Sequence, residues 1–176
     1  DSDWQTKIAS GKGWSYGVEF MGEKKWEKFN ASLAYTLAWT YRQFDEINRG
    51  KAYPFKYDRR HSLNFSFTYN LTENIDAGVN WMYSTGSAFT VPYEKYQTIE
   101  NPFVDYGYNQ EVTYFESRNN YRAPAYHRLD VGINFHKQKK WGVRTWSFSM
   151  FNAYGRHNPV FMYINTDYQG DMELTQ

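Results

Sequence analysis

The side chains with the greatest chemical potential in this chain are its four histidines, His61, His127, His136 and His157. A hydrolytic triad needs serine, histidine and an acid that converge in space, but the sequence has no G-x-S-x-G nucleophile elbow. No two histidines have zinc-ligand spacing together with an acid, and cysteine is absent. The sequence therefore predicts no enzyme, no metal site and no cofactor.

Two long segments, residues 43–60 and 85–126, are rich in tyrosine, proline, glycine and asparagine. Their aromatic rings could stack on a sugar, a porphyrin or a peptide side chain, or they could pack on each other and keep a long loop folded. An arginine adds a planar fork suited to carboxylate or phosphate groups. The candidate ligand contacts are Tyr53, Tyr57, Arg59, Tyr93, Tyr96, Tyr106, Tyr108 and Tyr121.

Strand-like segments must position these loops. Between Phe29 and Tyr41, apolar or aromatic residues occupy every second position, which in a strand makes one apolar and one polar face. This run is longer than an average globular strand of about 5–6 residues and long enough for the roughly 9–11 residues of a barrel strand that crosses a bilayer. The same alternation predicts six strands within residues 14–20, 29–42, 61–70, 75–84, 128–136 and 145–150.

The connections between these segments alternate in length. Residues 23–28, 71–74 and 137–142 form short polar turns, whereas 43–60 and 85–126 are long. Short periplasmic turns and long outer loops are typical of an outer-membrane barrel. Trp26 and Trp141 lie beside short turns, as expected of an interfacial aromatic girdle. The predicted lipid-facing residues are Leu33, Leu37, Phe65, Val79, Val131 and Ile133.

The opposite, polar face carries a few charges. These residues are Glu19, Arg42, Asp76, Arg128, Asp130 and His136. In an open channel they would tune selectivity, and in a plugged barrel they would bind the plug; they could equally be solvated residues of the lumen.

Composition limits the possible functions. The net charge is +1 and the basic residues are scattered, so nucleic-acid binding is not indicated. The mean hydropathy is -0.84, and no apolar run is long enough for a membrane-spanning helix. Aromatic residues make up 21% of the chain, which fits a membrane barrel but also a soluble aromatic-rich β protein.

Six strands do not close a barrel, because membrane barrels have at least about eight, and unpaired edges in lipid are costly. Residues 171–176 do not alternate as a barrel strand would. We therefore expect residues 1–176 to be one partial barrel domain, either of a larger barrel or of several chains that close together.

Four segments resemble the C-terminal part of a TonB-dependent outer-membrane receptor. They are SYGVEF at 15–20, YDRRHSLN at 57–64, NNYRAPAYHRLD at 119–130 and FNAYGRHNP at 151–159. The last is similar to the family's penultimate-strand signature, although Gly155 stands where the family often has asparagine.

This resemblance implies an all-β, antiparallel transmembrane barrel of about 22 strands with a plugged lumen. It implies a bacterial outer-membrane importer that takes up a scarce, large nutrient, with the plug domain, the final strand and the contact for the TonB-type energising complex outside this chain. The implied partners are membrane lipid, the rest of the barrel and its plug, and the resemblance leaves room for a surface lipoprotein. The residues leave two alternatives open: a passive pore or adhesin barrel, and a soluble β-sandwich or lipocalin-like binding module.

Overall fold

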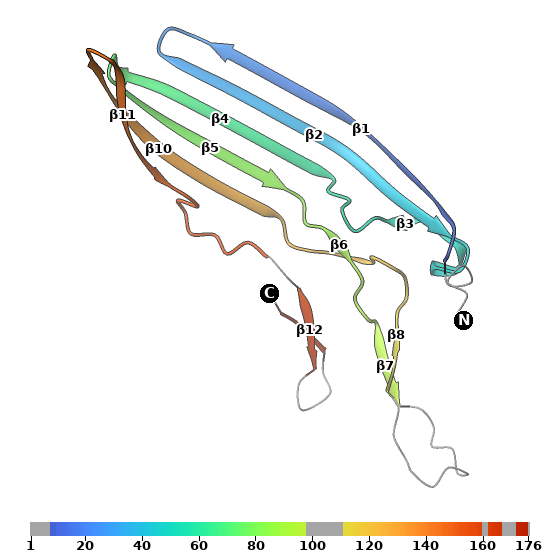
Figure 1. Ribbon diagram of the computed structural model, residues 1–176. Helices are drawn as coiled ribbons and strands as arrows, with labels where there is room; N and C mark the ends of the chain where they lie inside the picture. Colours follow the sequence, from blue (N-terminus) through green and yellow to red (C-terminus); the bar gives the residue numbers. More distant parts are fainter. Residues whose placement is uncertain (1–7, 98–110, 160–161, 167–171, 176) are drawn as a thin grey trace, which may run out of the picture. The chain divides into compact units, whose positions relative to one another are not determined.

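The computed structural model describes residues 8–97, 111–159, 162–166 and 172–175. It is an all-β structure whose largest element is an antiparallel sheet of long strands (Figure 1). These strands are β1 (Gly11–Lys25), β2 (Phe29–Phe44), β4 (His61–Thr72), β5 (Ile75–Ser84), β10 (Tyr126–Lys139) and β11 (Gly142–Met150). Within the described residues, no helix is both long enough and apolar enough to cross a membrane.

The long strands lie in the order β1-β2-β4-β5-β10-β11, so neighbours in the sheet are also successive long strands along the chain. All six predicted strands are present, but most are longer than predicted. Some of the polar residues predicted to form the short turns belong to the strands instead, because β1 extends to Lys25, β4 to Thr72 and β10 to Lys139. A backbone ladder does not need apolar side chains, so alternation of hydropathy marks the apolar part of each strand and underestimates its ends.

The sheet register places apolar residues of neighbouring strands side by side. Leu33 pairs with Phe65, Phe65 with Trp81, and Trp81 with Leu129. Two residues along the strands, Val79 pairs with Val131 and lies on the same face. Directly paired residues share a face, so the apolar side chains form one continuous surface across four strands.

The contacts of the chain divide it into two compact units. The strand wall comprises Tyr16–Trp39, Arg59–Gly86 and Ala123–Gln176, and the loop unit comprises Asp1–Ser15, Thr40–Asp58 and Ser87–Arg122. The strand wall includes a separate hairpin of β12 (Tyr163–Thr166) and β13 (Met172–Thr175), which hydropathy alternation did not predict.

The loop unit has secondary structure of its own, where the sequence predicted two long loops. The first segment contains a short 3-10 helix, η2 (Asn48–Gly50), and β3 (Tyr53–Pro54), which pairs with the end of β2. The described residues of the second form two short antiparallel pairs, β6 (Ala88–Phe89) with β9 (Tyr121–Arg122) and β7 (Glu94–Gln97) with β8 (Glu111–Tyr114).

Candidate ligand-binding site

The candidate ligand-binding site is a groove of about 590 Å³ in the loop unit. Both long segments contribute to it: one wall surrounds η2 and the other follows β8. The lining residues are Glu46, Ile47, Asn48, Arg49, Thr90, Phe115, Glu116, Ser117 and Arg118. The groove therefore combines an exposed aromatic ring with side chains of both charges, a mixture that suits a ligand with an apolar body and polar groups.

Local backbone geometry shapes the wall around η2. Asn48 and Arg49 have positive φ angles of 58° and 55°, and Gly50 follows with 71°. Asparagine and glycine tolerate this left-handed conformation, so it is favoured at two of the three positions. The carbonyl oxygen of Gly50 accepts a 2.7 Å hydrogen bond from the side-chain amide of Gln43, which fixes this turn to the end of β2.

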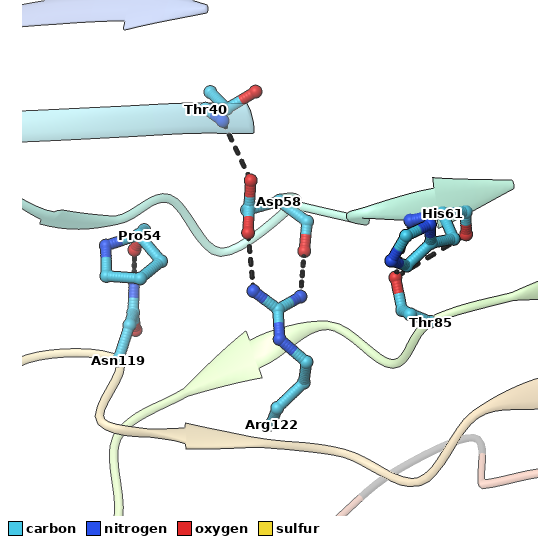
Figure 2. Close-up of polar contacts among 7 residues, drawn as sticks. All are labelled: Thr40, Pro54, Asp58, His61, Thr85, Asn119 and Arg122. Atoms are coloured by element: carbon cyan, nitrogen blue, oxygen red, sulfur yellow. Dashed lines mark hydrogen bonds and ion pairs between the residues drawn. The ribbon is translucent and has the colours of Figure 1, made fainter. Parts of the chain in front are cut away.

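Asparagine side chains join the two segments. The Asn119 side-chain amide donates to the carbonyl oxygen of Pro54 at 2.7 Å (Figure 2). The backbone N–H of Arg118 donates to the Asn48 side chain at 3.3 Å. On the other side, Asn119 N–H donates to the Thr90 hydroxyl at 3.0 Å. These bonds hold the two walls of the groove together.

Asp58 is the most deeply buried polar residue among the described residues of this unit, with 1% of its surface exposed. One carboxylate oxygen accepts from the backbone N–H of Thr40 at 2.7 Å, and the other pairs with the Arg122 guanidinium at 2.5 Å (Figure 2). The same guanidinium also donates to the Asp58 carbonyl oxygen at 2.5 Å. Asp58 thus connects β2, the first long segment and β9. The residues around it belong to two of the quoted motifs, but sequence reasoning did not pair them, because the partners are far apart in the chain.

The predicted aromatic contacts divide into packed and exposed rings. Tyr53 is only 6% exposed and stacks on Phe44, so it belongs to the interior of the loop unit. Tyr57 and Tyr93 are each 66% exposed, and Tyr121 is 44% exposed. A ring can be packed and exposed at once: Tyr121 meets Phe89 edge to face with centroids 5.2 Å apart and is still partly open to solvent. Packing therefore accounts for Tyr53, whereas the exposed Tyr57, Tyr93 and Tyr121 stay candidates for ligand contact.

The remaining candidates lie elsewhere. Arg59 lines a hollow of about 240 Å³ on the polar face of the strand wall, together with Thr36, Ser62 and Tyr126. The backbone of Tyr96 belongs to β7, but its side chain lies outside the described residues, as do Tyr106 and Tyr108 entirely.

The charged residues of the polar face form two clusters in the strand wall. His136 Nε2 lies 2.5 Å from an Asp76 oxygen, and the Asn134 amide donates to the other Asp76 oxygen at 2.7 Å. Arg128 pairs with Asp130 at 2.8 Å. Asn134 was missed as a partner, although it lies in phase with Asp130 and His136 along the strand.

Glu19 and Arg42 do not join these clusters. Glu19 is exposed on β1. The Arg42 guanidinium lies 4.3 Å from the centroid of the Phe55 ring, within the loop unit. Among the described residues, no group of three or more His, Cys, Asp or Glu side chains could hold a metal ion.

Two asparagines after β11 extend the edge of β10, and sequence reasoning did not identify their role. The Asn158 side chain accepts from His127 N–H at 3.0 Å and donates to the His127 carbonyl oxygen at 2.9 Å. Asn152, at a φ of 53°, donates its N–H to Asp130 at 3.0 Å. The next residue, Ala153, donates its N–H to the Leu129 carbonyl oxygen at 2.7 Å. Both asparagines belong to the FNAYGRHNP segment: the Asn158 amide bonds to the β10 backbone in place of a strand residue, and Asn152 bonds to β10 through its backbone N–H.

An antiparallel wall with one apolar face, short turns and a folded loop unit defines a protein of the outer-membrane barrel class. A family model described as "TonB dependent receptor-like, beta-barrel" matches residues 1–153, and the chain belongs to this family. No curated protein and no solved structure matches it in the corresponding comparisons. The family places the chain in the bacterial outer membrane and consists of transporters, not enzymes. The predictions of fold class, location and non-enzymatic role are therefore confirmed, and the soluble alternative is wrong. The match ends within the FNAYGRHNP segment.

Proposed function

We propose that this chain supplies part of the wall and the outer loops of an energy-coupled importer that captures a scarce, large solute. The groove in the loop unit carries this proposal, because residues from both long segments line it and hydrogen bonds join its walls. Tyr57, Tyr93 and Tyr121 supply exposed rings in the same unit. Rings can stack on an apolar body, and the groove arginines can bind carboxylate or phosphate groups.

We also propose that residues 1–176 form one part of a barrel of about 22 strands. Within the described residues, β1 and β11 each have one edge without a strand partner in the sheet. Such an edge is costly in lipid, so further strands would pair with both. The Asp76–His136 and Arg128–Asp130 clusters would then face the lumen, where a plug domain would find hydrogen-bonding partners.

The partners of the whole receptor follow from this proposal. Membrane lipid would contact the apolar face, and a TonB-type complex would supply energy through regions outside this chain. A surface lipoprotein would be compatible with the loop unit.

Uptake measurements in cells test the importer against a passive pore. Because import is energy-coupled, accumulation of the solute should stop when the proton gradient of the inner membrane is collapsed. Continued uptake at the same initial rate would instead show a passive pore.

A matched pair of variants tests the groove. Phe115 is 50% exposed and lines the groove, whereas Val112, in the same loop unit, is 48% exposed and does not. Binding would be measured with an oligosaccharide, a porphyrin and an aromatic peptide as probes. Phe115→Ala should weaken binding of the recognised probe roughly tenfold, and Val112→Ala should leave it unchanged. Equal effects of both variants would contradict a ligand site in this groove.

A further inference from the structure

The turn that joins β10 to β11 carries three cations on the apolar face of the strand wall. Val131, Ile133 and Phe135 define this face along β10, and the alternation continues to Lys137 and Lys139. Arg144 lies directly opposite Lys137, two pairs beyond Phe135 and Trp146 and therefore on the same face. The cations therefore form the border of the apolar surface at the short-turn end of the sheet.

Within the described part of the chain, these cations have no acidic partners. Like charges directly opposite each other in a sheet destabilise it, and Lys137 and Arg144 form such a pair. Among the residues that the structure describes, no carboxylate lies within ion-pair distance of Lys137, Lys139 or Arg144. An external anion would offset this repulsion.

Aromatic rings accompany the cations. The Arg144 guanidinium lies 5.7 Å from the centroid of the Trp146 ring, and Trp146 is 57% exposed. Phe135 and Phe148 meet edge to face and continue the apolar surface away from the turn. Exposed Trp141 lies in the turn itself. Tryptophan and cations at the border of an apolar band are typical of the membrane interface.

The β1–β2 turn repeats this arrangement and separates the charges by face. Lys24 continues the apolar alternation of β1 and lies 5.6 Å from the ring centroid of Trp26, which stacks on Phe29. The adjacent Lys25 points to the polar face and pairs with Glu23 at 3.2 Å. Glu23 thus neutralises Lys25 on the polar face, whereas Lys24 on the apolar face lies against the Trp26 ring.

We propose that these two turns bind the anionic headgroups of phospholipids in the periplasmic leaflet. The proposal rests on the assignment of the apolar face to lipid. Short turns are periplasmic in barrels of this type, and a cation near a membrane surface attracts anionic lipid. The source is a lipid and not a dissolved phosphate, because the cations directly adjoin the apolar rings. Acyl chains would cover Phe135, Trp146 and Phe148 while the phosphate reaches Lys137 and Arg144.

The test titrates the complete, purified receptor in neutral detergent with dioleoyl phosphatidylglycerol and with dioleoyl phosphatidylcholine. The native receptor should retain the anionic lipid preferentially. A triple variant, Lys137→Gln with Lys139→Gln and Arg144→Gln, should bind it more than tenfold more weakly, since each cation near a membrane surface contributes about fivefold. An unchanged affinity in the triple variant, or equal retention of both lipids by the native receptor, would overturn the proposal.

The β1–β2 turn offers a matched control. Lys24→Gln should weaken phosphatidylglycerol binding about fivefold, whereas Lys25→Gln, on the other face, should change it less than twofold. Equal effects would show a nonspecific charge effect and overturn the site. Competition by glycerol phosphate as strong as that of the lipid would assign the cations to free phosphate instead. Solute uptake is not part of this measurement, so failure here leaves the importer proposal intact, and the lipid assignment of the apolar face is tested separately by substitution at Leu33.

Discussion

The strand wall and the loop unit are stabilised in different ways. The wall consists of long antiparallel ladders, and many of its large apolar side chains are exposed, such as Val18 at 69% and Phe148 at 62%. The loop unit instead buries Tyr53, Ala88 and Asp58 among its own residues. The wall therefore depends on backbone pairing and leaves its apolar face exposed, whereas the loop unit has a small interior that joins two segments distant in the chain.

The largest expected effect comes from a charge on the apolar face of the wall. Leu33→Arg should prevent stable insertion, because an arginine on the lipid face near the bilayer centre costs about 2–4 kcal/mol. Val131→Arg should act in the same way. The measurement is the amount of folded receptor in purified outer membranes.

The control places the same charge on the polar face. Ser32 neighbours Leu33 and pairs with Ser66 across the ladder, so Ser32→Arg should leave the folded amount close to that of the native protein. Similar losses at Leu33 and Ser32 would show that the wall has no lipid-facing side.

The next effect concerns the buried carboxylate of the loop unit. Asp58→Ala leaves the Arg122 guanidinium and the Thr40 N–H without this acceptor, and should reduce the local stability of the loop unit by about 2–3 kcal/mol. The readout is hydrogen exchange, which should accelerate at Thr40 and in β9 but not in β10. The exposed Asp45→Ala is the control, and an equal response from it would contradict a special role of Asp58.

A close backbone approach gives a smaller effect, in the wall. A Cβ atom on Gly86 would lie 1.9 Å from the carbonyl oxygen of Ala123, so the backbone must move to accept Gly86→Ala. We expect a loss of about 1–3 kcal/mol, measured as a lower midpoint of thermal unfolding. At Gly22 the added atom would meet only the Phe20 ring at 3.5 Å, so Gly22→Ala should be tolerated. Equal shifts for the two variants would argue against strain at Gly86.

The smallest effect is expected at Asn158, whose side chain bonds to the β10 backbone in the way that a neighbouring strand would. Asn158→Ala removes both hydrogen bonds to the backbone of His127 and should cost about 1 kcal/mol. Asn158→Asp keeps the acceptor but not the donor, so it should have an intermediate effect. Hydrogen exchange at the His127 amide is the measurement, and protection that is unchanged in Asn158→Ala would exclude this role.

Much of the wall could be predicted from sequence, because successive side chains of a strand point to opposite faces and the apolar residues occupy every second position. Leu33, Phe65, Val79 and Val131 share the predicted face for this reason. The strand ends were less predictable, since residues such as Lys25 and Lys139 extend the ladder through their backbone and carry no apolar signal.

The loop unit was less accessible to sequence reasoning. Its aromatic content was evident, but nothing local distinguishes the buried Tyr53 from the exposed Tyr57. The Asp58–Arg122 pair and the bond from Asn119 to Pro54 join residues far apart in the chain, and such pairings depend on tertiary structure. The groove follows from these pairings, so the sequence predicted a binding region and not a site.

The short β6–β9 strand pair also affects how the wall folds. β5 and β10 must pair across the whole second long segment, and closure of a long flexible loop has an entropic cost that grows with its length. The pairing of Ala88 with Arg122 brings the two ends of that segment together. If it forms early, it lowers the closure cost for β5 and β10 by about 1–2 kcal/mol. The β6–β9 pair would then accelerate assembly of the wall as well as shape the loop unit.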